Sequence, residues 1–221
     1  MVPAVFLSMR PDTDTQCKRC GTCCRKGGPA LHRQDRNLVN HDYISIERLF
    51  TIRIGEPVRD DVRGLLTTAG EEIIKVKGAA GNWACTFFDD PANQCTIYDH
   101  RPIECRLLCC RETSAIERAY KTDRLTRKAL LGHIEGLWSI VAQHQQRCDY
   151  RQIAELLDKS PLTAGSFQAG TVAEAIRYDR ALRELIVEKN LATFDTLDFI
   201  FGRPVAVVVR DLKKFEMLRD I

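Results

Sequence analysis

The sequence predicts a mainly α fold with a small β-hairpin, in which an irregular cysteine-rich module packs on a helical region. Two observations lead to this prediction. Nine of the ten cysteines lie between residues 17 and 110, together with most of the turn-forming glycines. From residue 112 onward, apolar residues recur at helical spacing and only one cysteine remains. We therefore expect two regions, residues 1–111 and 112–221, packed against each other as one unit.

Short elements separated by turns are expected in the first region. Ser45 to Arg53 reads as a short helix, because Ser45 is a suitable N-cap and Gly55 and Pro57 follow its end. Glu72 to Lys77 alternates like a strand. Trp83 to Phe88 could be its partner, which would give a hairpin that carries Cys85.

Two further predictions complete this region. Asp89 to Asn93 has the composition of a turn, and Cys95 to Tyr98 follows it as a second short extended piece. Between the two strands of the hairpin, Gly78 to Gly81 is rich in small residues and is expected to be a flexible link beside Trp83.

Helical signals dominate the second region. Ser114 to Glu117 and Thr171 to Glu174 both fit a capping box. Two apolar stripes then recur at helical spacing and predict amphipathic helices that pack on a core; the stripes are Leu130, Ile134, Leu137, Trp138 and Val141, and Tyr178, Leu182, Leu185 and Ile186. The apolar run from Val205 to Val209 fits either a strand or a helix.

Charge and hydropathy restrict the class of protein. The net charge is only +3, so we do not expect a nucleic-acid partner. Nucleic-acid binding is kept as a minor alternative because one stretch is basic; its basic residues are Arg101, Arg106, Arg111, Arg118, Arg124, Arg127 and Lys128. No segment approaches the ~20 apolar residues of a membrane span. Val2 to Met9 is too short for a signal peptide. We therefore expect a cytoplasmic protein with reduced thiols rather than a disulfide scaffold.

The chemistry of the chain is indicated by its first cysteines, which follow the pattern C-x2-C-x2-C-C. Cys17, Cys20 and Cys23 have the spacing with which a loop holds three corners of a 4Fe-4S cluster, the fourth ligand coming from far along the chain. Cys105 is the distant ligand that we favour. Zinc is the alternative, but a zinc ribbon would need a second C-x2-C pair, which the sequence lacks.

Further thiols extend the candidate ligand set. The complete set of candidate metal ligands is Cys17, Cys20, Cys23, Cys24, Cys85, Cys95, Cys105, Cys109 and Cys110. Adjacent cysteines seldom bind one ion together, because neighbouring side chains diverge. Nine thiols could therefore form two four-cysteine sites with one left over, or a single centre beside structural cysteines.

Three blocks of the sequence resemble the CxxCxxCC cysteine-cluster family, whose members are described as chelating zinc or iron. The blocks are the opening C-x2-C-x2-C-C, the cysteine and aromatic pair of Cys85-Thr86-Phe87-Phe88, and the segment from Cys95 to Arg106 with its Arg101-Pro102 step. The resemblance covers about residues 17 to 110. It implies a cysteine-rich metal-binding module in residues 1–111, but no reaction.

Other polar residues could support or complete the centre. Arg101 and Arg106 could offset the negative charge of several thiolates, and Glu104 could pair with either of them. His100 lies inside the last cysteine block and is a possible ligand. His144 and Cys148 lie four residues apart on one helix face and could complete a site, but we favour a surface histidine and a buried thiol. His32, His41 and His133 carry no signal.

Two classes of function follow. The first is a metal-thiolate protein with a redox, metal-handling or sensing role. We favour an iron–sulfur cluster as its bound group, and it could have a protein redox partner. The second is an iron–sulfur-dependent enzyme acting on a protein or small molecule. A zinc-stapled interaction domain is the structural alternative. The sequence contains no GxGxxG, GxxxxGK[ST] or HExxH motif, so it names neither a substrate nor a catalytic residue.

Overall fold

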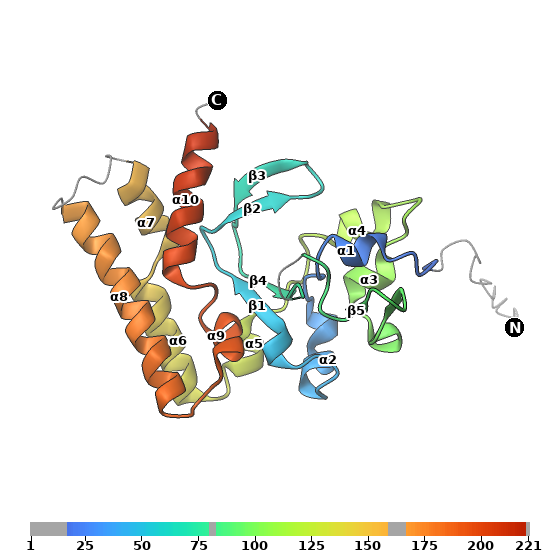
Figure 1. Ribbon diagram of the computed structural model, residues 1–221, viewed down its shortest axis with the longest axis horizontal. Helices are drawn as coiled ribbons and strands as arrows, with labels where there is room; N and C mark the ends of the chain where they lie inside the picture. Colours follow the sequence, from blue (N-terminus) through green and yellow to red (C-terminus); the bar gives the residue numbers. More distant parts are fainter. Residues whose placement is uncertain (1–16, 80–82, 159–166, 220–221) are drawn as a thin grey trace, which may run out of the picture.

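A computed structural model describes residues 17–79, 83–158 and 167–219. The N-terminal stretch Val2 to Met9 and part of the expected link, Ala80 and Gly81, lie outside these residues. Along its longest axis the molecule has helices α6, α7, α8 and α10 at one end and the cysteine-bearing segments around α1, α3 and β5 at the other (Figure 1). Strands β1 and β4 lie between the two ends.

The cysteine-rich region contains short elements, as predicted. Its helical pieces are α1 (Thr22–Arg25), η1 (Arg33–Asp35), α2 (Arg36–Asn40), η2 (Ile46–Arg48), η3 (Tyr98–His100) and α3 (Ile103–Leu107), and α4 (Ser114–Ala119) follows at the start of the second region. Its strands are β1 (Leu49–Ile52), β2 (Pro57–Asp60), β3 (Leu65–Thr68), β4 (Ile73–Val76), β5 (Phe88–Asp89) and β6 (Gln94–Cys95). All three strand pairs are antiparallel: β1 with β4, β2 with β3, and β5 with β6.

The expected helix from Ser45 to Arg53 is wrong beyond its first turn. Ser45 does cap η2, accepting a hydrogen bond from the backbone N–H of Glu47 at 3.4 Å. The chain then becomes strand β1, in which Leu49 lies opposite Val76 of β4. Leu49 is fully buried, so pairing and burial outweigh the local helix signal.

The strand expected over Glu72 to Lys77 is confirmed as β4, but its expected partner is wrong. β4 pairs with β1. The segment from Trp83 to Phe88 instead meets the chain after β4, through the Gly78–Cys85 bridge and through hydrogen bonds from Thr86 N–H to the Lys77 carbonyl at 3.0 Å and from Ala79 N–H to the Ala84 carbonyl at 2.6 Å. The turn expected between Asp89 and Asn93 is confirmed, because it joins β5 to β6.

Beyond residue 124 the described chain is helical. The helices are α5 (Arg127–Leu131), α6 (Glu135–Arg147), α7 (Tyr150–Asp158), α8 (Phe167–Glu188), α9 (Phe194–Ile200) and α10 (Val205–Arg219). The single helix expected from Leu130 onward is instead two helices, with a break from Gly132 to Ile134. The run from Val205 to Val209 opens α10, which settles its assignment as helix.

Neither capping box has the expected form. Thr171 to Glu174 lies inside α8, which begins at Phe167. At α4 the N-cap residue is Thr113 rather than Ser114, and the Thr113 hydroxyl donates to Glu117 at 2.5 Å. The start predicted from the sequence therefore differs from the observed start by one residue for α4 and by several residues for α8.

The main core contains apolar residues of both regions. Leu31, Leu49 and Ile74 pack in the same cluster as Leu125, Val141, Leu197 and Phe199. A second cluster is formed by α7, α8, α10 and the C-cap residue of α6, Cys148; its other members include Tyr150, Ile153, Val172, Val205, Val208 and Leu212. The fold is mainly α with short antiparallel hairpins, which confirms the predicted class.

Candidate metal centre

The first cysteine loop is held by contacts with the turn between β5 and β6. Gly21 has a φ of +73°, and a Cβ there would lie 2.4 Å from Cζ of Phe88, so only glycine fits. Arg25 pairs with Asp90 at 2.6 Å. The Asn93 amide donates to the carbonyl of Arg19 at 2.9 Å. These contacts explain how residues distant in sequence bring the loop beside the later cysteines.

Backbone hydrogen bonds place the next two cysteines against the loop. The N–H of Cys85 donates to the carbonyl of Cys24 at 2.7 Å. Cys85 also accepts from Phe88 N–H at 2.8 Å, and Phe88 lies opposite Cys95 in the β5–β6 pair. The thiols of Cys23 and Cys24 are 3.9 Å apart. Each of the ten cysteines is a free thiol in the structure.

The pKa values of the clustered cysteines indicate that their thiol groups lie within electrostatic range of one another. Burial, Cys23, Cys85 and Cys95 together raise the pKa of Cys24 to about 12. Burial raises the pKa of Cys105 well above its ordinary value, and the thiols of Cys85, Cys23, Cys24 and Cys95 raise it further. A group of thiolates would repel one another here, and a bound cation would remove that repulsion.

The cysteines after α3 lie at the exposed side of the same cluster. Burial raises the pKa of Cys110, and nearby Cys23, Cys20, Cys17 and Cys109 add to the effect. The pKa of exposed Cys20 is lowered, chiefly by hydrogen bonding to the Thr22 hydroxyl, 3.3 Å from the sulfur. Apart from Cys109, which acts only on its neighbour Cys110, the cysteines between residues 17 and 110 thus lie near enough to affect one another's acidity.

The donor set fits a thiophilic metal, because thiolates are the ligands of structural zinc and of iron–sulfur clusters. As the side chains lie, however, no group of three or more His, Cys, Asp or Glu residues within 17–79, 83–158 and 167–219 is arranged to hold a metal ion.

Glu104 was expected to pair with Arg101 or Arg106, and this expectation is wrong. Its carboxylate instead accepts from Arg124 at 2.7 Å and from the N–H of Ala30 at 2.7 Å, and lies 3.2 Å from Nε2 of His32. These partners lower the pKa of Glu104 although burial opposes them. Glu104 therefore ties α3 to the chain that follows the first cysteine loop.

A second carboxylate completes this connection. Asp35 accepts from the N–H of Ile103, the first residue of α3, at 2.9 Å, and from the N–H of His32 at 3.0 Å. Arg106 approaches Asp35 at 3.9 Å. We define the His32–Asp35–Glu104–Arg124 group as the α3 clamp. No local pattern singles out His32, because the partners of its ring lie 72 to 92 residues away; these are Glu104, Thr122 and Arg124.

Arg101 has the position expected of a residue that offsets thiolate charge. It stacks over the ring of Tyr98 at 3.7 Å and donates to the Tyr98 carbonyl at 2.8 Å. Its charge lowers the pKa of Cys95, although burial raises that pKa more. Close to Cys95 the surface has a hollow of about 300 Å³, lined by Arg19, Gln94, Cys95, Thr96, Ile97, Tyr98, Asp99 and His100.

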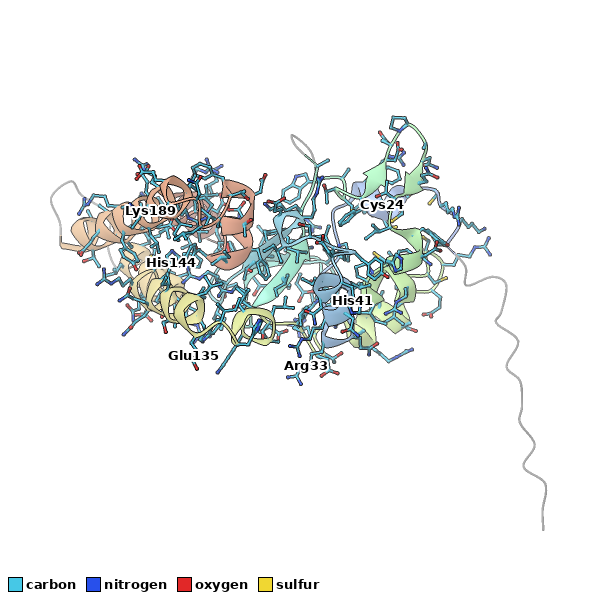
Figure 2. The ribbon with its side chains drawn as sticks, turned by 90° about the horizontal axis from the view of Figure 1, so that it is seen from below. Cys24, Arg33, His41, Glu135, His144 and Lys189 are labelled. Atoms are coloured by element: carbon cyan, nitrogen blue, oxygen red, sulfur yellow. The ribbon has the colours of Figure 1, made fainter. Side chains whose placement is uncertain are left out.

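The remaining histidine candidates lie elsewhere. His100 is exposed and stacks on Tyr43, with 3.7 Å between the ring centroids. His144 is fully buried, so the expected surface histidine is wrong, whereas the expected buried thiol of Cys148 is confirmed. Nε2 of His144 lies 2.8 Å from Asp179. Figure 2 shows His144 among the helices and Cys24 toward the opposite end of the molecule.

The surface beside Trp83, next to the expected flexible link, is open. Trp83 is 81% exposed, and with Gly78 it lines a second hollow of about 390 Å³ whose other walls are Phe50, Lys77, Asp195, Asp198 and Arg203. Cys85 itself is buried. Within the described residues, no helix is long and apolar enough to cross a membrane.

The cysteine-rich part of the chain is similar to a known family. Residues 16–124 match the model of a family described as "CxxCxxCC: Putative zinc- or iron-chelating domain". The matched segment contains all nine clustered cysteines and ends at Arg124 of the α3 clamp. No curated protein and no solved structure matches the chain.

Proposed function

Residues 16–124 belong to the CxxCxxCC family, and from this premise we propose that they bind a metal through cysteine thiolates, with an iron–sulfur cluster as the bound group. The single observation that supports this most is the gathering of nine thiols from distant parts of the chain. Free cysteines that only fill a core need not approach one another. Here several raise one another's pKa, so their thiolate forms would repel one another, and a bound cation would remove that repulsion.

Iron–sulfur is favoured over zinc by the number and spacing of the thiols. A structural zinc ion uses four ligands in a closed tetrahedron. The clustered cysteines exceed that number, and the first loop has the C-x2-C-x2-C spacing of cluster-binding loops. When bound, such a cluster would supply one-electron chemistry. The chain itself contributes the thiolates, the cation Arg101 beside Cys95, and the clamp that holds α3.

A redox, metal-handling or sensing role agrees best with this arrangement. Cys20 and Cys110 are exposed, so a partner protein or a small thiol could reach them. The hollow beside Cys95 gives a second approach to the cluster from solvent. A wholly structural metal would have no need of such access.

The test is the metal content of the full chain purified without oxygen. We expect coloured protein that contains iron and acid-labile sulfide, because sulfide-bridged iron absorbs visible light and zinc, with its filled d-shell, does not. A matched sample of the Cys23→Ser variant should lose iron and sulfide in parallel. Colourless wild-type protein that holds stoichiometric zinc under the same conditions would contradict the iron–sulfur proposal.

A further inference from the structure

The surface hollow beside Cys95 has polar and aromatic groups that binding of a metal by thiolates does not require. Its volume is about 300 Å³, at the lower end of the range of about 300–1,000 Å³ that is typical of small-molecule sites. Arg19, Tyr98, Asp99 and His100 are among the residues that line it. The hollow therefore combines a cation, an anion and two aromatic rings on one surface.

Two guanidinium groups lie against one ring of this hollow. The guanidinium carbon of Arg19 is 4.1 Å from the centroid of the Tyr98 ring, and that of Arg101 is 3.7 Å from it. In the described part of the chain, neither guanidinium forms an ion pair with a carboxylate. A guanidinium that stacks through its face keeps the N–H groups at its edge, and these can donate to an oxyanion such as phosphate.

The backbone holds Arg19 beside the hollow in an unfavourable conformation. Its φ is +55°, in the left-handed region that residues with a Cβ rarely adopt. The side-chain amide of Asn93 stabilises this conformation by donating to the Arg19 carbonyl at 2.9 Å. Residues kept in such conformations cluster at ligand-binding sites. The strain at Arg19 therefore points to a binding role for its side chain, which is exposed.

A second ring of the hollow is fixed by stacking. The imidazole of His100, the last residue of η3, stacks on Tyr43 with 3.7 Å between the ring centroids and 16° between the ring planes. Tyr43 also meets His41 edge-on, with 6.3 Å between their centroids. An aromatic ring that is held at the wall of an open hollow offers a surface on which a planar ligand can stack, as nucleobases do on aromatic side chains.

We propose that this hollow binds a mononucleotide, with the base against His100 and the phosphate at the N–H groups of Arg19 and Arg101. Such a ligand joins the two chemistries that the hollow offers, a planar ring and an oxyanion. Asp99 would repel the phosphate, so it is assigned to the hydroxyl or amino groups of the ligand, which its carboxylate can accept from.

A single nucleotide fits the charge of the chain better than a long strand. The net charge is only +3, whereas strand binding relies on many contacts between cations and phosphates. The proposal goes beyond the proposed metal binding, and it holds whichever metal the thiols bind.

Calorimetric titration of the full chain, purified without oxygen, with AMP tests this site. Wild-type protein should bind AMP more tightly than adenosine, which lacks the phosphate, and more tightly than inorganic phosphate, which lacks the ring. Arg19→Gln should weaken AMP binding about tenfold or more and leave adenosine binding unchanged, because only hydrogen bonds to the phosphate are lost. His100→Ala should weaken the binding of both compounds about tenfold, because stacking is lost. The control Arg210→Gln removes an exposed arginine of α10 and should bind AMP like wild type.

The metal content of the same samples separates this proposal from the proposed function. Weakened AMP binding with unchanged metal content in Arg19→Gln and His100→Ala supports the site, and both replaced side chains are exposed, so both variants should fold. AMP binding by protein that holds no metal would support the site and contradict the proposed function.

Three results would overturn the nucleotide site and leave the proposed function standing. The first is wild-type protein that binds no AMP, or that binds inorganic phosphate as tightly as AMP. The second is equal AMP affinity in wild type, Arg19→Gln and His100→Ala. The third is loss of metal in parallel with AMP binding in both variants, because the effect would then belong to the metal centre.

Discussion

At the scale of single residues, the α3 clamp is the buried polar group that holds α3 beside the candidate metal centre. Glu104 and Arg124 form a buried ion pair, with side chains 11% and 4% exposed, and Glu104 also satisfies the N–H of Ala30. Buried pairs contribute little relative to apolar replacements, but removing one partner is costly because the other charge stays buried. The clamp thus makes the position of Cys105 depend on residues outside the cysteine motifs.

We predict that Glu104→Ala lowers the free energy of unfolding by about 3–5 kcal/mol, because Arg124 would be left buried and unpaired. Denaturant unfolding of the metal-free protein measures this. The matched control is Asp90→Ala, which breaks the Arg25–Asp90 pair, whose side chains are 47% and 67% exposed. That control should cost about 1 kcal/mol or less. Equal losses of unfolding free energy in both variants would contradict the stabilising role of the α3 clamp.

His144 predicts a pH dependence of stability in the helical region. Burial lowers its pKa below the ordinary 6.5, and the charges of Arg53 and Arg183 lower it further, although Asp179 opposes them. The unfolded chain therefore binds a proton at a higher pH than the folded chain. Stability is fully present above about pH 6.5 and falls as the pH drops below that value.

The expected result is that His144→Gln reduces the loss of unfolding free energy between pH 7 and pH 5, by up to about 1.4 kcal/mol per pH unit. Urea unfolding at both pH values measures it. His133→Gln is the control, since His133 is exposed on the link between α5 and α6 and should leave the pH dependence unchanged. If His144→Gln and His133→Gln give the same slope as wild type, His144 does not have this role.

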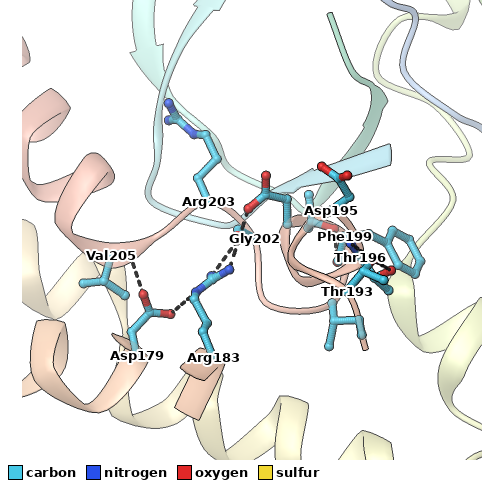
Figure 3. Close-up of polar contacts among 12 residues, drawn as sticks. Asp179, Arg183, Thr193, Asp195, Thr196, Phe199, Gly202, Arg203 and Val205 are labelled. Atoms are coloured by element: carbon cyan, nitrogen blue, oxygen red, sulfur yellow. Dashed lines mark hydrogen bonds and ion pairs between the residues drawn. The ribbon is translucent and has the colours of Figure 1, made fainter. Parts of the chain in front are cut away.

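At the scale of elements, the connection between α9 and α10 locks the helices to the strands. Arg183 of α8 donates to the carbonyl of Gly202 at 2.7 Å and to Asp179 at 2.8 Å, and Asp179 accepts from Val205 N–H at the start of α10 (Figure 3). From β1, the Thr51 hydroxyl donates to the Phe199 carbonyl at 2.7 Å. Three helices and a strand therefore meet at this connection.

Gly202→Ala should destabilise the protein by at least about 1–2 kcal/mol, because φ is +80° and a Cβ would lie 2.8 Å from Cδ of Arg53. Gly136→Ala is the matched control, since this exposed glycine of α6 has nothing within 4 Å of its added Cβ. It should be neutral or stabilising by up to about 1 kcal/mol. Thermal unfolding of both variants compares them, and a Gly202→Ala protein as stable as Gly136→Ala would refute this account.

Sequence reasoning succeeded where the pattern is local and failed where distant segments decide. The strand at Ile73–Val76 and the turn after Asp89 were predicted because alternation and turn residues are local signals. The helix expected after Ser45 failed because β1 is stabilised by pairing with a strand about 25 residues later. Glu104 was assigned the wrong partners for the same reason, since its contacts depend on tertiary structure.

At the scale of the whole molecule, the candidate centre and the helical end are distinct but share one core. The main core includes Leu31 and Leu49 from the cysteine-rich region and Val141 and Phe199 from the helices. Arg127 also connects the cysteine-rich region to the helices, because it pairs with Glu72 at 2.6 Å and donates to the Ile200 carbonyl. The helices α6, α7, α8 and α10 lie at one end of the molecule and the cysteine-bearing segments at the other (Figure 1).

X-ray absorption of the anaerobically purified full chain tests the central claim most directly, because it identifies both the metal and the atoms bound to it. We predict an iron signal whose first shell consists of sulfur at about 2.3 Å, the distance typical of metal–thiolate bonds. The same shell should persist in Cys148→Ser, because Cys148 is buried in the second core, among the helices. A first shell of nitrogen and oxygen atoms would contradict a thiolate centre.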